Sequence, residues 1–278
     1  MKASISLRAA ILSVVLLVLL LVVWEVLCRV PASAAVSADD EYALLMGEAE
    51  QEARVPPPSV VLAHAYAELS QPFYDNGPND KGIGIQLAHS LYRVLTGYLL
   101  AALVAIPIGF VIGMSPLMYC ALNPFIQILR PISPLAWMPL ALFVIKDSQT
   151  SAIFVIFICS VWPMLLNTAF GVVGVRKEWI NVARTLEVGT VRRAFTVILP
   201  AAAPTILTGM RISIGIAWLV IVAAEMLVGG TGIGYFVWNE WNNLSITNVI
   251  IAILLIGLVG MLLDQVLARF TRMVTFPE

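Results

Sequence analysis

Charged side chains are scarce in this sequence. Asp, Glu, Lys and Arg together make up 12% of its 278 residues, about half the share of an ordinary soluble domain. Hydrophobic residues make up 60%, and the mean hydropathy is +0.93. These values indicate an integral membrane protein. The net charge of −1 argues against nucleic acid as a partner.

Residues with metal-binding or nucleophilic chemistry are also few. The cysteines Cys28, Cys120 and Cys159 lie in separate apolar segments without disulfide or metal spacing, so we expect them to pack. His64 and His89 are isolated, which favours capping or surface roles. We expect no metal site and no serine, histidine and acid set for hydrolysis.

A phosphate-binding loop is missing as well. Such a loop needs Gly-Lys followed by Ser or Thr, and none of the four lysines stands in that context. The glycine-rich string 229–234 follows an apolar span with no preceding strand, so nucleotide binding is not expected there. We expect a flexible re-entry of the chain at this string, and no cofactor bound by the chain itself.

Six apolar segments are long enough to span a bilayer, which takes roughly 20 helical residues. They lie at about 9–28, 91–113, 121–145, 151–172, 206–228 and 248–268. The sequence therefore predicts an all-α integral membrane protein with six transmembrane helices. For the first segment we favour a retained anchor over a cleaved signal peptide, because Glu25 and Arg29 precede the cleavage-like Ala32-Ser33-Ala34.

The distribution of lysine and arginine predicts the orientation. With the N-terminus inside, nine basic residues fall inside: Lys2, Arg8, Arg176, Lys177, Arg184, Arg192, Arg193, Arg269 and Arg272. Four fall outside: Arg29, Arg54, Lys81 and Lys146. We therefore expect both termini and the segment 181–200 in the cytoplasm.

The outside segment 29–88 differs from the rest in composition. Residues 39–53 are acidic and could form a short amphipathic helix, and Ser59 is placed to cap a second helix through about Glu68. A turn is expected at 75–80. The acidic cluster does not match a calcium loop, so we favour a solvated flap, with docking of a soluble partner as an alternative.

Prolines gather in the second and third spans, four of them between 124 and 139. Proline breaks a helical hydrogen bond, and membranes tolerate this where protein or water satisfies the freed groups. The pattern fits a cavity-lining helix or simple kinking about equally. Gly109-xxx-Gly113 would let another backbone approach closely.

Charged residues inside spans are expensive and usually face the bundle interior. Arg211 and Glu225 lie about 21 Å apart along the fifth span, so they cannot pair with each other. Arg93 should lie at the depth of Glu225, and we predict an ion pair between them. Arg130 and Arg211 could attract an anion; the alternatives are snorkelling to headgroups or pairing with Asp264.

The most informative segment is Asn181 to Pro200, a polar stretch bearing Arg184, Arg192 and Arg193 between two apolar spans. It resembles the cytoplasmic coupling loop of permease subunits in binding-protein-dependent ABC importers. That family's pattern is Glu-Ala-Ala, three residues, Gly, nine residues, Ile, any residue, Leu-Pro. Here 181–183 replace Glu-Ala-Ala, Glu187 stands at the glycine with Gly189 two later, and Leu199-Pro200 match.

The resemblance extends over roughly 83–268. The segments 133–139, 223–227 and 229–234 look like those of nitrate, taurine and alkanesulfonate permeases. The segments 151–157, 162–163 and 167–169 look closest to the nitrate branch, which includes bicarbonate and cyanate relatives. The resemblance implies the type I ABC importer permease architecture, with an anchor at 1–28, a periplasmic segment at 29–88 and a five-helix core at 89–278 carrying the loop 173–205.

The resemblance also implies partners and sites in a bacterial inner membrane. A periplasmic solute-binding protein would deliver a small anion, nitrate first. Two ATPase subunits would hold ATP and Mg and would receive a short helix such as 182–186. A second permease copy, giving a homodimer, and lipid would complete the surroundings. The expected ATPase-coupling residues are Asn181, Val182, Ala183, Arg184, Thr185, Leu186, Glu187, Gly189, Leu199 and Pro200. The expected pathway residues are Arg130, Trp137, Arg211, Trp218 and Glu225.

Three alternatives stay open at this point. The first keeps the mechanism and changes the cargo to taurine or another alkanesulfonate. The second is a membrane-embedded enzyme or scaffold without transport, and the third is a secondary transporter. The sequence favours a transport subunit that is not itself an enzyme.

Overall fold

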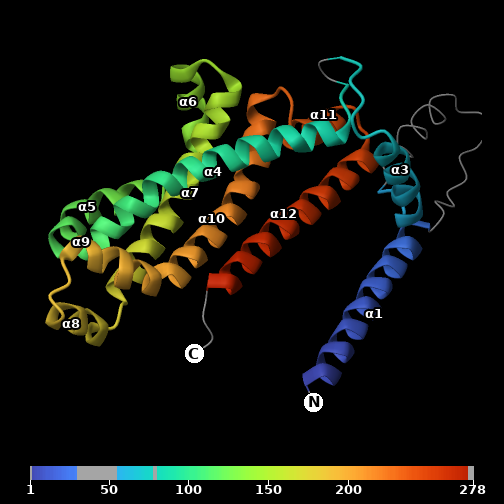
Figure 1. Cartoon of the computed structure of the whole chain (residues 1–278). Coiled ribbons are helices and arrows are strands. Elements are labelled where there is room, and N and C mark those ends of the chain that lie inside the picture. The colour runs from blue at the N-terminus through green and yellow to red at the C-terminus, as the bar shows by residue number, and fades with distance from the viewer. Residues whose placement is uncertain (1, 30–54, 78–79, 275–278) are drawn as a thin grey trace, which may run out of the picture. The chain divides into compact units, whose positions relative to one another are not determined.

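A computed structural model describes residues 2–29, 55–77 and 80–274 (Figure 1). Regular structure in these ranges is helical, apart from one antiparallel bridge between Asp75 and Lys81. The elements are α1 Lys2–Arg29, α3 Pro58–Ser70, α4 Ile83–Met114, α5 Pro116–Leu129, η1 Pro134–Ala136, α6 Trp137–Ile145, α7 Ser148–Val173, α8 Lys177–Thr185, α9 Thr190–Arg193, η2 Ala194–Ile198, α10 Leu199–Val228, α11 Ile233–Asn242 and α12 Ile246–Val274. The all-α prediction is confirmed.

Five of the six predicted spans are continuous helices long and apolar enough to cross a membrane. Within the described residues these are Arg8–Cys28, Ile83–Met114, Ser148–Val173, Thr190–Val228 and Ile246–Met273. Each begins or ends beyond its predicted apolar run, because a helix continues into the polar flanks where backbone hydrogen bonds still form. The fifth span is extended most: it starts at Thr190, inside the polar segment 181–200.

The third predicted span, 121–145, is two helices joined by a sharp bend, so the prediction of one continuous helix was wrong. Pro116–Leu129 and Pro134–Ile145 are bent by 76° at their junction. Pro131 and Pro134 lie at the break, where their missing N–H groups cannot continue the helical ladder. Only if the bent pair counts as a single span does the described chain have six.

The residues that the structure describes divide between two compact units, whose bounds along the chain are as follows. The first unit comprises Met1–Gly84 with Phe236–Leu255, and the second comprises Ile85–Tyr235 with Ile256–Glu278. In the first unit, Glu25 of α1 meets the start of α3, where its carboxylate accepts hydrogen bonds from Ser59 N at 3.1 Å and Ser59 Oγ at 2.9 Å. The predicted capping role of Ser59 was therefore wrong: α3 begins at Pro58, one residue earlier, and the side chain of Glu25 binds its first turn. The predicted acidic helix at 39–53 lies outside the described residues.

In the second unit, α4 packs on α7 through small residues. Five of them recur every four positions, which places them on one face of the helix: Gly97, Ala101, Ala105, Gly109 and Gly113. A Cβ added at Gly109 would come within 2.5 Å of the Leu165 carbonyl oxygen, and one added at Gly113 would come within 2.6 Å of the Val172 Cβ. The close backbone approach predicted for Gly109-xxx-Gly113 is confirmed, with α7 as the partner.

A buried cluster joins the ends of α7 and α10 in the second unit. Its buried members are Val172, Val175, Ile198, Ala202 and Ile206. Ile180 of α8 packs against it, as do Phe110 and Met114 of α4. The contact of Ile180 with this cluster therefore packs α8 against the ends of α7 and α10.

Candidate functional site

The segment predicted to couple with ATPase subunits contains a short surface helix, α8. It spans Lys177–Thr185 and not 182–186 as predicted, so Leu186 is its C-cap residue. Within α8, Ala183 is buried and Val182 is 60% exposed, and the C-cap residue Leu186 is 70% exposed. Trp179 is also exposed, with the Arg176 guanidinium 5.5 Å from its ring centroid. The helix therefore presents apolar side chains outward, although most of its residues are polar.

Glu187 stands where the family pattern has glycine, and its backbone conformation shows why the pattern has glycine there. Its φ is +55°, in the left-handed region that favours glycine. Glu187 N donates to Arg184 O at 2.9 Å, and Val188 N donates to Ala183 O at 3.0 Å. These are the two hydrogen bonds of a Schellman motif, which usually has glycine at this position. The turn that ends α8 therefore has the backbone conformation typical of glycine, although the residue is glutamate.

The remaining coupling candidates lie in distinct surroundings. Asn181, Arg184 and Thr185 are exposed on α8, and Gly189 is the N-cap residue of α9 with open space around it. Leu199 packs against the buried cluster, and the exposed Pro200 lies in the first turn of α10. Between them η2 is a π-helix, which the sequence did not predict. Val191 and Phe195 add two exposed apolar side chains to this region.

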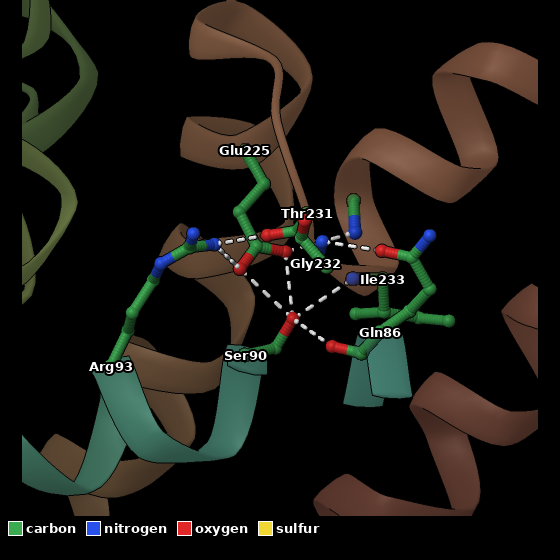
Figure 2. A network of polar contacts seen from close by, with 8 residues as sticks. Gln86, Ser90, Arg93, Glu225, Thr231, Gly232 and Ile233 are labelled. Atoms are coloured by element: carbon green, nitrogen blue, oxygen red, sulfur yellow. Dashed lines mark hydrogen bonds and ion pairs between the residues drawn. The ribbon is translucent and has the colours of Figure 1, made fainter. Parts of the chain in front are cut away.

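Arg93 and Glu225 form the predicted ion pair. Arg93 Nη1 of α4 lies 2.7 Å from Glu225 Oε1 of α10, and Glu225 is only 2% exposed (Figure 2). Ser90, one turn earlier on α4, places its hydroxyl 2.8 Å from Glu225 Oε2. The similar depth of Arg93 and Glu225 in their spans sufficed to predict the ion pair, whereas Ser90 was missed because serine is common in spans.

The glycine string 229–234 closes over this ion pair. Figure 2 shows its backbone running past the carboxylate of Glu225. The backbone of four consecutive residues, 231 to 234, is hydrogen-bonded to side chains. Two of these bonds involve the ion pair itself: Thr231 O accepts from Arg93 Nη1 at 2.6 Å, and Gly234 N donates to Glu225 Oε2 at 3.0 Å. The other two reach α4: Gly232 N donates to Gln86 Oε1 at 2.6 Å, and Ile233 N donates to Ser90 Oγ at 2.9 Å. A side chain at Gly232 would collide with the carboxylate. The predicted flexible re-entry is thus corrected to a turn fixed by hydrogen bonds.

Arg211 forms a second ion pair, with Asp264 of α12. Arg211 Nε lies 2.5 Å from Asp264 Oδ1, and Nη2 lies 2.6 Å from Oδ2. Their side chains are 46% and 47% exposed, although both residues lie within membrane-spanning helices. Of the alternatives open for Arg211, the structure shows pairing with Asp264.

The other three pathway candidates are dispersed. Arg130 is exposed at the C-cap of α5, just before the bend. Trp137 is half-buried at the start of α6, and its Nε1 has no hydrogen-bond partner among the described residues. Trp218 is buried and donates from Nε1 to Ile256 O at 2.9 Å, so it packs α10 on α12. The five candidates therefore do not form a single cluster in this chain.

Asp147 is a polar residue that the sequence analysis missed. It is the N-cap of α7 and accepts hydrogen bonds from Thr150 Oγ1 and, at 2.8 Å, from Thr150 N. These bonds lower the pKa of the Asp147 carboxyl. Since a lowered pKa favours the folded state above the ordinary pKa of the group, this stabilisation is lost as pH falls through the folded-state pKa. The Asp-x-x-Thr spacing before an apolar run could have revealed the cap.

The second unit also has an apolar groove of about 330 Å³ between α4 and α7. It is lined by apolar side chains such as Leu100, Leu103 and Phe154, and Thr150 is the one polar residue in the lining. This lining offers no charge for a polar ligand. The part of the chain that the structure describes holds no group of three His, Cys, Asp or Glu residues that could bind a metal.

Comparison with known proteins places these features in a family. Residues 105–275 match the family model described as "Binding-protein-dependent transport system inner membrane component". The chain is 44% identical over 264 residues to the nitrate import permease protein NrtB of Synechocystis sp., covering 95% of this chain and 89% of that protein. It is also 44% identical over 224 residues to the bicarbonate transport system permease protein CmpB of the same organism, covering 80% of each.

A solved structure has the same fold. It is described as an inward facing conformation of the MetNI methionine ABC transporter. The matched chain gives a TM-score of 0.61 at 16% sequence identity, covering 68% of this chain and 94% of that one. This likeness concerns the fold alone, and it agrees with the expected permease architecture.

Proposed function

This chain belongs to the family of inner membrane components of binding-protein-dependent transport systems, and on that premise we propose that it is the permease subunit of an ATP-driven nitrate importer. The observation that carries the proposal is the 44% identity to a nitrate import permease over 95% of the chain. The chain is a transport subunit and not an enzyme.

Bicarbonate is the second candidate substrate, because a bicarbonate permease is equally identical over 80% of the chain. Nitrate and bicarbonate are both planar, singly charged oxyanions, so similar donors suit both. The relatives named for nitrate and bicarbonate do not favour the alternative of taurine or an alkanesulfonate.

We propose that two ATPase subunits bind ATP and Mg, and that each docks on the α8 helix of one permease copy. Several exposed apolar side chains in this region support this, since exposed apolar surface rimmed by polar residues marks protein interaction sites: Trp179, Val182, Leu186, Val191 and Phe195. Arg184 and Arg192 are also exposed and would meet acidic groups at the rim. Closure of the ATPase pair would move α8, and the buried cluster beneath Ile180 would pass that movement to α7 and α10.

The proposed assembly is completed by a second copy of this chain, lipid and a periplasmic solute-binding protein. With the N-terminus inside, nine Lys or Arg residues fall on the inner side and four on the outer side, which supports cytoplasmic termini and a cytoplasmic α8. Fusion of alkaline phosphatase to the C-terminus tests this orientation: the fusion should be inactive, and an active enzyme would contradict it.

Uptake of isotopically labelled nitrate tests the proposed function. Cells lacking this subunit but carrying its ATPase and binding-protein genes should take up nitrate only after the subunit is restored. Labelled bicarbonate and taurine are measured in the same cells. Restored uptake of bicarbonate alone would favour the second candidate, and restored uptake of taurine alone would refute an inorganic anion as the substrate.

A further inference from the structure

The Arg211–Asp264 ion pair is exposed where a membrane protein ordinarily hides charge. Both side chains are nearly half exposed in this chain, and both lie within spans. Charged groups in spans face a protein interior or water, because exposure to hydrocarbon costs several kcal/mol. The Arg93–Glu225 pair follows that rule by burial within this chain. The Arg211–Asp264 pair must instead face water or another protein surface.

Two glycines on the helices that carry this ion pair have open space above them. Gly215 follows Arg211 by one turn on α10, and Gly257 precedes Asp264 by two turns on α12. A Cβ added at either would meet no atom within 4 Å. By contrast, Cβ atoms added at Gly209 and Gly260 of the same two helices would crowd Asn167 and Trp218.

The absence of packing at Gly215 and Gly257 calls for another reason to keep glycine there. Glycine inside a helix is destabilising relative to alanine. Helix packing within this chain does not explain either residue. Because α10 and α12 run in opposite directions, both glycines lie to the same side of the ion pair along the helix axes. No atom of this chain occupies the space over Gly215, one turn from Arg211 on the same face of α10.

The geometry of the ion pair indicates which ligand would fit. Arg211 donates from Nε and Nη2 to the two oxygens of Asp264, along one edge of the guanidinium plane. A planar oxyanion such as nitrate or bicarbonate presents two oxygens on one edge in nearly the same way as a carboxylate. The guanidinium fork binds such edges in a bidentate manner.

We propose that Arg211 binds the transported oxyanion and that Asp264 is a resident counter-ion which the anion displaces. This proposal rests on the proposed function. Exchange of one oxyanion edge for another keeps the Arg211 charge neutralised throughout. Competition from Asp264 also weakens the hold on the anion, and transport requires binding weak enough for the substrate to leave.

The first experiment asks whether the ion pair faces water. Cys28 and Cys120 are replaced by serine, and Thr208→Cys is introduced one turn before Arg211, where the side chain is exposed. In the assembled complex with its ATPases, in nanodiscs, a charged thiol reagent should label Cys at 208. The matched control, Leu99→Cys on the apolar exposed face of α4, should not react. Absence of labelling at 208 overturns the proposal.

The second experiment uses inorganic nitrate as the probe. Nitrate should slow the labelling at position 208, and R211Q should abolish this protection. D264N removes the competitor, so half-maximal protection should need about 1.5- to fivefold less nitrate, the range expected for loss of an exposed ion pair. Equal protection with and without Arg211, or no protection, overturns the proposal. This readout does not depend on uptake, so a failure of the proposed function remains distinguishable.

The third experiment fills the open space. The Cβ that G215L introduces would meet no atom of this chain within 4 Å, so the complex should assemble and melt as the parent does. Nitrate uptake should fall at least tenfold, because the leucine occupies the space beside Arg211. If Gly215 faces lipid, uptake by G215L will equal that of the parent complex, and the proposal is wrong.

Discussion

Glu187 shows how one residue can depart from a family pattern without changing the local fold. The pattern has glycine where this chain has glutamate, and the backbone there is left-handed in this chain as well. A left-handed conformation costs an L-residue about 1–2 kcal/mol. The hydrogen bonds of Glu187 N and Val188 N to α8 hold the conformation against that cost.

We therefore expect Glu187→Gly to stabilise the end of α8. The gain should be up to about 1 kcal/mol, because the relief of strain is partly offset by the larger unfolded-state entropy of glycine. Hydrogen exchange of the amides in α8 should slow accordingly. Glu187→Ala is the control: it keeps a Cβ in the left-handed region and should give no gain. Faster exchange in the glycine variant would contradict this account.

At the scale of elements, α4 holds α10 and the glycine string together through one helical face. Gln86, Ser90 and Arg93 lie three to four residues apart, so their side chains reach the same neighbour. They meet Glu225 at the end of α10 and the backbone of the string that follows it (Figure 2). The ion pair thus also fixes the path of the chain into α11.

We expect Glu225→Gln to destabilise the protein strongly. The change leaves the buried Arg93 charge without its partner, and breaking a buried pair costs about 3–5 kcal/mol. The melting temperature of the purified complex should fall by several degrees and nitrate uptake with it. Glu240→Gln, which alters the less buried contact with Asn248, is the control and should have little effect.

A double variant separates the ion pair from other effects of the substitution. Arg93→Met combined with Glu225→Gln should be less destabilised than the sum of the two single variants, because neither charge is then left alone. Additive losses would show that the two residues act independently.

At the scale of the whole molecule, two exposed surfaces are explained by assembly with other subunits. The apolar side chains on α8 and the ion pair of α10 and α12 are both exposed in the single chain. The first suits a protein partner, and the second suits a water-filled path. A permease that works with soluble partners must expose such surfaces in isolation.

We expect Leu186→Asp to weaken the attachment of the ATPase subunits. Burial of a leucine contributes about 1.5–3 kcal/mol, so co-purification of the ATPase should fall by roughly ten- to a hundredfold. Leu62→Asp on α3, an equally exposed leucine of the first unit, is the matched control and should leave co-purification intact. Unchanged co-purification in the Leu186 variant would refute docking through α8.

The sequence by itself determined the membrane class, the positions of five continuous spans and the partner of Arg93. These follow from properties read along one dimension: the length of apolar runs, and the depth at which a buried charge needs neutralisation. Only the tertiary structure decided that the third span is bent, that the glycine string closes over Glu225 and that Arg211 pairs with Asp264. Each of these depends on which helices are neighbours and which faces they turn to one another, and hydropathy and spacing within a single segment do not encode that.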